Sequence, residues 1–148
     1  MFSNKPTIVI VPGSFTAYGV YDNFLKMIRD KGFSAFAIQL PSTQKRHPLP
    51  PATLQDDASH VRGVIERLVA EEEGREVMVV GHSYGGSVIT EALSGLGLGE
   101  GEGGDHKEKR KAGVKRLVFL SATVPKIGET QTSAMKLEAG MLPEEVVS

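Results

Sequence analysis

At residues 77–86 the sequence reads Val-Met-Val-Val-Gly-His-Ser-Tyr-Gly-Gly. The apolar start of this stretch is typical of a buried strand, and apolar residues at helical spacing follow the glycines directly. Gly81, Ser83 and Gly85 fit the pattern G-x-S-x-G, in which a strained strand-to-helix turn lifts a serine hydroxyl above a sheet. This placement favours Ser83 as a nucleophile, with Gly81 and Gly85 leaving room for the turn. In the alternative interpretation, Ser83 only caps the helix.

Three further apolar runs predict strands on either side of this turn: Thr7–Val11, Phe33–Leu40 and Leu117–Leu120. The first shows no polar alternation, as expected of a strand buried on both faces of a parallel sheet. Helical patterns lie between the strands, so the sequence predicts an α/β fold, a parallel sheet with flanking helices. The helical patterns are carried by Val20, Phe24, Met27, Ile28 and Lys31, and by Leu54, Ala58, Val61, Ile65 and Leu68 behind a capping box of Thr53 and Asp56.

Composition and charge argue against several classes of partner and of binding site. The chain has 148 residues, 17 Lys+Arg against 18 Asp+Glu, a net charge of -1 and no cysteine. Such a balance argues against nucleic acid or an anionic membrane as a partner, and the lack of cysteine excludes disulfides and thiolate metal sites. No phosphate loop, dinucleotide loop or metal-ligand spacing is recognised, so we expect no cofactor and no metal. Because neither a signal peptide nor a membrane span is recognised, we expect a soluble, cytoplasmic protein.

Three segments of the chain resemble the α/β-hydrolase family: Ile8–Ser14, Gly81–Gly86 and Leu117–Ala122. The likeness is to the N-terminal half of the fold, and within the family to the small esterases that include plant methylesterases and hydroxynitrile lyases. It implies a truncated α/β-hydrolase fold of about four strands, whose C-terminal strands are missing. Residues 1–148 would then form a single partial domain.

Two segments of this domain differ from the rest. Residues 97–113 carry six glycines and eight charged residues, which predicts a flexible insertion. The resemblance implies that residues 125–148 form the start of a cap region. It also implies the strand order second, first, third, fourth, which leaves Leu117–Leu120 at an edge of the sheet.

The resemblance further implies roles for the backbone near Ser83. The N–H of Tyr84 would pair with the N–H of Ser14 or of Phe15 to stabilise a negatively charged oxygen. Which of these two residues donates stays open. Pro12 stands where the family usually has a histidine, whose side chain is not the donor to that oxygen.

A serine nucleophile needs a base and an acid, and the four histidines were each compared with that requirement. His82 precedes Ser83 in the turn, so its side chain is expected to point away from the serine. His60 follows the apolar stripe of a helix and is expected at or near the surface. The pair Asp105-His106 lies beyond a helix that rises about 20 Å toward the opposite edge of the sheet. Only His47 is expected on the catalytic edge.

Glu129 follows the last strand, where some members of the fold carry the acid, but no histidine near it can serve as its base. The sequence therefore predicts a serine hydrolase of small-molecule carboxylic esters that lacks its acid and histidine and is inactive as this chain alone. Two alternatives stay open: a non-catalytic binding module, and one half of a two-chain enzyme. The edge at Leu117–Leu120 is expected to self-associate, to recruit a partner with the missing strands, or to lower solubility.

Overall fold

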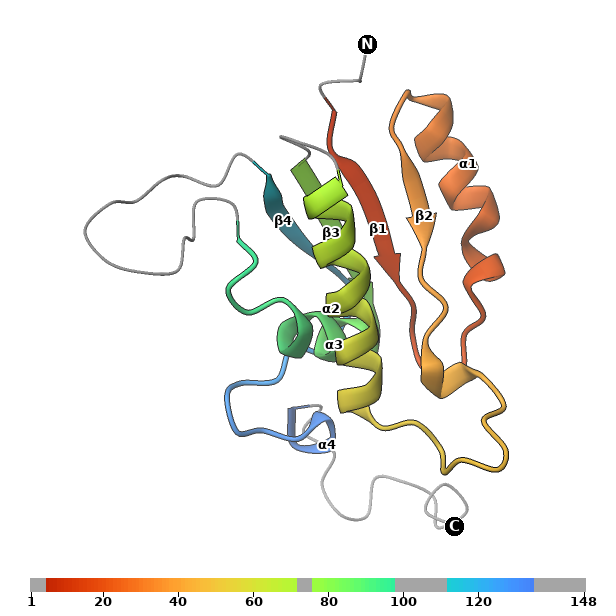
Figure 1. The fold of residues 1–148 in the computed structure, drawn as a ribbon, viewed down its shortest axis with the longest axis vertical. Coiled ribbons are helices and arrows are strands. Elements are labelled where there is room, and N and C mark those ends of the chain that lie inside the picture. The colour runs from red at the N-terminus through yellow and green to blue at the C-terminus, as the bar shows by residue number, and fades with distance from the viewer. Residues whose placement is uncertain (1–4, 72–75, 98–111, 135–148) are drawn as a thin grey trace, which may run out of the picture.

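The computed structural model describes residues 5–71, 76–97 and 112–134 of the chain. Its centre is a parallel four-stranded sheet in the order β2-β1-β3-β4 (Figure 1). The strands are β1 (Thr7–Val11), β2 (Ala35–Ala37), β3 (Glu76–His82) and β4 (Gly113–Leu120). The predicted fold class and strand order are therefore confirmed.

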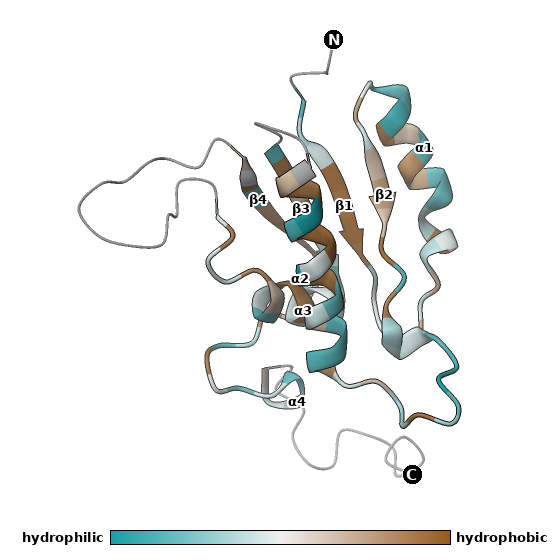
Figure 2. Ribbon diagram, viewed as in Figure 1, coloured by the Kyte–Doolittle hydropathy of each residue, from teal (hydrophilic) through white to brown (hydrophobic). Residues whose placement is uncertain are grey.

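Helices cover both faces of this sheet. On one face, α2 (Leu54–Glu71) and α3 (Gly85–Ala92) pack on Val9, Val11 and Val79. On the other face, the 3-10 turn Tyr18–Tyr21 and α1 (Asp22–Asp30) pack on Ile8, Ile10 and Val80. Figure 2 shows the strands as mainly hydrophobic, with hydrophilic residues toward the outer side of the helices. The alternating strand residues thus supply two separate apolar cores.

The apolar stripe of α2 forms as predicted. Ala58, Val61 and Ile65 are buried, and Leu54 and Leu68 pack against the same core. The capping box is present, because the Thr53 N–H donates to Asp56 Oδ2 at 2.8 Å and the Asp56 N–H donates to Thr53 Oγ1 at 3.3 Å. The Thr53 N–H and the Thr53 hydroxyl, which donates to Asp56 Oδ2 at 3.1 Å, favour the charged form of the Asp56 carboxylate and lower its pKa.

The predicted apolar pattern of the first helix is right for Ile28, which packs against the core, and wrong for its other apolar residues. Val20 is 71% exposed and Met27 is 62% exposed, whereas Tyr21 and Leu25 are buried. A 3-10 turn precedes α1, so the helical phase begins later than the sequence pattern indicated. The side chains that enter the core at the start of this helix therefore lie one position later in the sequence than the pattern predicted.

The limits of two strands also differ from the prediction. β2 is three residues long and lies within the predicted run Phe33–Leu40, and Ile38 and Leu40 beyond it are still buried. β4 begins at Gly113, which pairs with Glu76, so the end of the predicted insertion 97–113 is strand. Residues 98–111 lie outside the described residues, as do residues 135–148 of the predicted cap region. Within 125–134, α4 (Gln131–Ala134) is the described helix.

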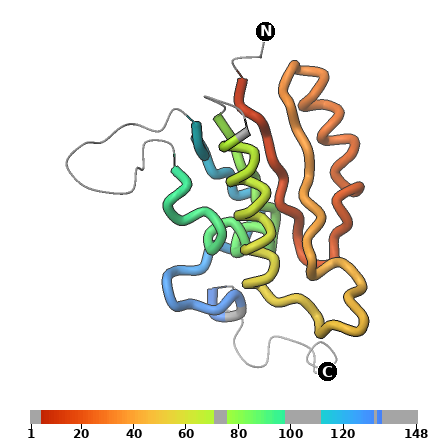
Figure 3. The backbone as a smooth tube through the Cα atoms, viewed as in Figure 1, coloured from red at the N-terminus to blue at the C-terminus, as the bar shows by residue number. Residues whose placement is uncertain are grey.

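The carboxyl ends of the strands point to one end of the molecule, the lower end in Figure 1. The turn after β1, the loop after β2 with its 3-10 turn η2 (Pro41–Thr43), the turn after β3 and the segment after β4 all start there. Figure 3 shows that the chain after β2 and the chain after β4 approach this same end. In open parallel sheets this edge is where ligands bind, so it holds the candidate site.

Candidate functional site

Ser83 stands at the junction of β3 and α3 with a strained backbone. Its φ is +52°, in the left-handed region that residues with a Cβ rarely adopt, so the predicted strain is confirmed. The turn is held from both sides. The Ser83 N–H donates to the Leu120 carbonyl at 3.3 Å, and the Ser83 carbonyl accepts from the N–H groups of Gly86 at 3.0 Å and Thr123 at 3.1 Å. The geometry therefore fixes the backbone of this serine at the carboxyl edge.

Three glycines allow the close packing of this turn. A Cβ on Gly85 would lie 2.2 Å from the Val11 carbonyl oxygen, and a Cβ on Gly81 would lie 2.8 Å from the Gly85 oxygen. A Cβ on Gly86 would lie 2.5 Å from the Thr123 oxygen. The sequence reasoning predicted the need for Gly81 and Gly85. The contact of Gly86 with the segment after β4 could not be inferred from local sequence.

The loop after β1 lies beside Ser83. A Cβ added to Gly13 would be 3.3 Å from Ser83 Cβ. Phe15 in this loop has φ +56°, and its side chain is 97% exposed. Within the described part of the chain, the backbone N–H groups of Ser14, Phe15 and Tyr84 donate to no protein acceptor. The three predicted donors thus lie on the two segments that flank Ser83, with their N–H groups available to a ligand.

Two tyrosines connect these segments to the rest of the fold, and sequence reasoning missed the partner of each. Tyr21 accepts a hydrogen bond from the Gly13 N–H at 3.3 Å and contacts His82 Nδ1 at 2.7 Å. Tyr84 donates through its hydroxyl to Asp57 Oδ2 at 2.9 Å. An acid on the apolar stripe of a helix, four residues before Val61, was the available signal for Asp57.

Asp57 is a fully buried carboxylate, with 0% of its surface exposed. Its Oδ1 accepts from the Ser42 N–H at 2.9 Å, so it joins α2 to the loop after β2 as well as to Tyr84. Burial raises the pKa of the Tyr84 phenol far above its ordinary value, and the hydrogen bond and negative charge of Asp57 raise it further. The raised pKa keeps the Tyr84 phenol protonated at neutral pH, so its hydroxyl acts as the donor to Asp57.

Replacing Tyr84 with phenylalanine is expected to destabilise the chain. The variant keeps the ring but leaves Asp57 Oδ2 buried without its donor, which costs about 1–3 kcal/mol. Urea unfolding should show this as a lower midpoint with an unchanged slope. Tyr18→Phe is the matched control, because the Tyr18 side chain is 52% exposed and should be replaced without effect. Equal midpoints for Tyr84→Phe and the unmodified chain would contradict the stabilising role of this bond.

Within the described residues, no histidine side chain hydrogen-bonds to Ser83. The side chain of His82 bonds to Tyr21, which agrees with the expectation that it points away from the serine. His60 is exposed on α2, as expected, and His47 is exposed in the loop after β2. Glu129 is exposed and accepts from the Lys126 N–H at 2.9 Å, so it closes a local turn. Asp105 and His106 lie outside the described residues.

Among residues 5–71, 76–97 and 112–134, no group of three or more His, Cys, Asp or Glu side chains is arranged to hold a metal ion. No helix in the same ranges is both long and apolar enough to cross a membrane.

Comparisons with known proteins agree with this geometry. The model of the alpha/beta hydrolase family matches residues 8–145. The chain is 42% identical over 142 residues to "Probable hydrolase R7" of Phoma sp. (strain ATCC 20986 / MF5453), covering 96% of this chain and 52% of that protein. It is 32% identical over 145 residues to "Alpha/beta hydrolase nvfD" of Aspergillus novofumigatus (strain IBT 16806), with the same two coverages, 96% and 52%. The chain thus spans about half the length of the curated relatives it matches.

A solved structure shows the same relation at the level of the fold. The crystal structure of polyneuridine aldehyde esterase superposes with a TM-score of 0.64 at 19% identity. The match covers 90% of this chain and 46% of that chain. At this identity the likeness establishes the arrangement of strands and helices.

Proposed function

Because this chain belongs to the alpha/beta hydrolase family, we propose that it carries the nucleophile of a serine hydrolase acting on small-molecule carboxylic esters. One observation carries the proposal. Ser83 has φ +52° at the carboxyl end of a central strand, next to backbone N–H groups of Ser14, Phe15 and Tyr84 that have no acceptor among the described residues. A strained serine beside unpaired amide donors is the arrangement that acyl transfer requires.

In the proposed reaction, Ser83 Oγ attacks the ester carbonyl carbon while a base accepts the hydroxyl proton. The carbonyl oxygen becomes negatively charged in the tetrahedral intermediate, and the N–H of Tyr84 and one N–H of Ser14 or Phe15 stabilise that charge. The intermediate then breaks its bond to the alcohol, which leaves with the proton from the base. Water attacks the resulting acyl-serine by the same steps and releases the carboxylic acid.

We propose that the acid and base come from outside the described residues, because no described histidine side chain hydrogen-bonds to Ser83. His82 is bonded to Tyr21, and His60 is exposed on α2. His47, which is exposed at the carboxyl edge, is the alternative base from this chain. The relatives are about twice as long as this chain, which leaves room for these groups in the rest of such a protein.

Covalent labelling tests the proposal on the protein isolated from its source, whose intact mass should first be compared with 15.9 kDa. A fluorophosphonate should form a Ser83 Oγ–P bond and release fluoride, with the serine proton passing to the base. Peptide mass spectrometry should find the label on Ser83 and not on Ser59, an exposed serine of α2. A label absent from Ser83, in protein that hydrolyses esters, would reject this serine as the nucleophile. Bound ester without hydrolysis would favour the non-catalytic binding module.

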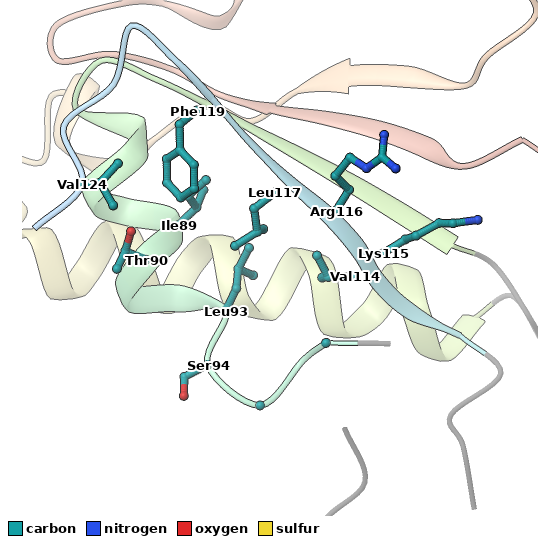
Figure 4. Close-up of a pocket in the computed structure, with 12 residues that line it drawn as sticks. Ile89, Thr90, Leu93, Ser94, Val114, Lys115, Arg116, Leu117, Phe119 and Val124 are labelled. Atoms are coloured by element: carbon teal, nitrogen blue, oxygen red, sulfur yellow. The ribbon is translucent and has the colours of Figure 1, made fainter. Parts of the chain in front are cut away.

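The outer side of β4 favours a second arrangement, one half of a two-chain enzyme. Within the described residues, β3 is the one strand paired with β4, and Gly97 adds an isolated parallel bridge to Val114 near the start of β4. Leu117 is 39%, Phe119 40% and Leu120 45% exposed, and the charges of this strand, Lys115 and Arg116, lie before these apolar residues, whereas natural sheet edges usually protect such a run with charges or proline. A groove of 480 Å³ lies between β4 and α3 (Figure 4), and its apolar lining comes from Ile89, Leu93, Val114, Leu117, Phe119 and Val124. We propose that another strand and apolar side chains cover this surface.

In the absence of another partner, two copies of the chain are expected to associate through this surface. Sedimentation at micromolar concentration should therefore give a mass above 15.9 kDa. Phe119→Lys should restore the monomer by placing a charge in the groove. Met27→Lys is the matched control, because Met27 is 62% exposed on α1, away from β4. A well-folded monomer of the unmodified chain would show that this edge needs no cover.

A further inference from the structure

Tyr21 lies between the two segments that flank the candidate nucleophile. Its hydroxyl oxygen is 3.3 Å from the Gly13 nitrogen in the loop after β1 and 2.7 Å from His82 Nδ1, directly before Ser83. The Tyr21 and His82 rings meet edge to face, with centroids 5.9 Å apart and an interplanar angle of 82°. Tyr21 is 8% exposed, and Gly13 is buried. The contact between Tyr21 and His82 is partly buried and joins residues 61 positions apart.

The direction of these hydrogen bonds follows from their donors. The Gly13 N–H can only donate, so the Tyr21 oxygen accepts. The Tyr21 hydroxyl can donate to His82 Nδ1 when the His82 proton is on Nε2, and we infer this tautomer because it gives the hydroxyl proton an acceptor. Two hydrogen bonds thus connect Gly13 to Tyr21 and Tyr21 to His82.

The loop after β1 has few other bonds to fix it. Its internal bonds run from the Thr16 N–H to the Gly13 oxygen at 3.3 Å and from Thr16 Oγ1 to the Ser14 oxygen at 3.0 Å. Both stay within the loop, and neither sets the distance of the loop from Ser83. Phe15 at φ +56° is a conformation that persists only where its surroundings hold it. The hydrogen bond from the Gly13 N–H to Tyr21 therefore connects the start of this loop, through Tyr21, to His82, the residue before Ser83.

We propose that Tyr21 is a positioning residue, which holds the loop carrying Ser14 and Phe15 in register with Ser83 through His82. This inference rests on the proposed function, in which one amide of that loop binds the developing negative charge. Amide donors stabilise such a charge only when they are already aimed at the position of the oxygen. Tyr21 touches no reacting atom, so its effect passes entirely through the loop.

Hydrogen exchange of the 148-residue chain tests the anchoring without any need for catalysis. In Tyr21→Phe, which keeps the ring, the Gly13 amide should exchange about tenfold faster or more, the factor that corresponds to one ordinary hydrogen bond. Amides of Val9 and Ile10 in β1 should exchange as before. Tyr18→Phe is the matched control from the same 3-10 turn, and its Gly13 rate should not change. An unchanged Gly13 rate in Tyr21→Phe would overturn the anchoring.

Variants at His82 test the hydrogen bond between Tyr21 and His82. Nitrogen NMR of the four histidines should show Nδ1 of His82 as the acceptor at neutral pH, and this signal should move in Tyr21→Phe. His82→Asn offers an amide oxygen close to the position of Nδ1 and should keep the Gly13 amide protected. His82→Ala should lose that protection. If the Gly13 amide exchanged at the same rate in these two variants, the hydrogen bond between Tyr21 and residue 82 would not contribute to holding the loop.

The catalytic consequence is measured in the complete enzyme from its native source. Tyr21→Phe should lower kcat about tenfold with little change in KM, because the contact of the oxyanion forms in the transition state. A role in stability alone would leave kcat unchanged and would overturn the positioning role. If Ser83→Ala had no effect on hydrolysis, the proposed function would fail, and the exchange of Gly13 would still decide separately whether Tyr21 anchors the loop.

Discussion

Replacing Gly85 with alanine is expected to prevent this chain from folding. The new Cβ would lie 2.2 Å from the Val11 carbonyl oxygen and 2.8 Å from the Pro12 carbonyl oxygen. Both are backbone atoms at the end of a central strand, so no side-chain rotation relieves the contact. The start of α3 would have to move away from β1, and Gly81 and Val11 would lose their close packing. We expect a loss of at least about 3 kcal/mol, which is a large part of the stability of a small domain.

Circular dichroism and urea unfolding measure this effect, and Gly63 provides a matched control. Gly63 lies inside α2, and a Cβ placed there meets nothing within 4 Å. Gly63→Ala should therefore raise stability by about 0.5–1 kcal/mol, since alanine favours a helix interior over glycine. The same substitution thus has opposite signs at two helical positions. A folded Gly85→Ala chain with unchanged stability would show that the turn between β3 and α3 tolerates a side chain at this position.

Much of the fold could be predicted because its central strands are continuous apolar runs, a pattern typical of buried strands. Thr7–Val11 is buried along its whole length, and a strand with two buried faces needs a continuous apolar run. The capping box at Thr53 and Asp56 marks the start of α2 within one residue. The strand order followed from the family resemblance rather than from the residues themselves.

The errors occur where local pattern and tertiary packing disagree. The first helix carries apolar residues on both sides, so its sequence permits two faces, and the buried one is set by Tyr21 and its bond to His82. β4 starts before the predicted position because Lys115 and Arg116 are strand residues with exposed side chains. The β3–β4 pairing shifts register between Val77 and Met78, so Lys115 occupies an irregularity that alternation cannot predict.

The candidate site likewise contains residues that the local sequence pattern could identify and residues that it could not. Ser83 could be identified from a local pattern, because a strained turn needs its glycines close in sequence. Tyr21 and Asp57 could not be assigned from local pattern, because their partners His82 and Tyr84 are distant in sequence. A tyrosine near a helix start and an acid in a first helical turn each have an ordinary local explanation. Long-range polar contacts of this kind become visible only in three dimensions.

On the proposed function, Ser83→Ala in the active protein from its source is expected to lower kcat for a nitrophenyl ester by about 10⁶-fold, as loss of a serine nucleophile does in other hydrolases. The backbone of the turn should persist, because the bonds of residue 83 to Leu120, Gly86 and Thr123 use main-chain atoms. Unchanged urea unfolding would therefore separate lost chemistry from lost structure. Ser59→Ala, at an exposed serine of α2, should keep full activity.

The 148-residue chain assayed alone distinguishes the origin of the base. Without a base and an acid, the amide donors and Ser83 should give hydrolysis only about 10³–10⁴-fold above the rate in water. The intact serine hydroxyl then contributes little, so Ser83→Ala should change this residual rate by much less than it changes the complete enzyme. Turnover by the chain alone at enzyme-like rates, abolished by Ser83→Ala, would contradict an external base. His47→Ala would then be the decisive variant, since His47 is exposed in the loop after β2, which starts at the carboxyl edge of the sheet.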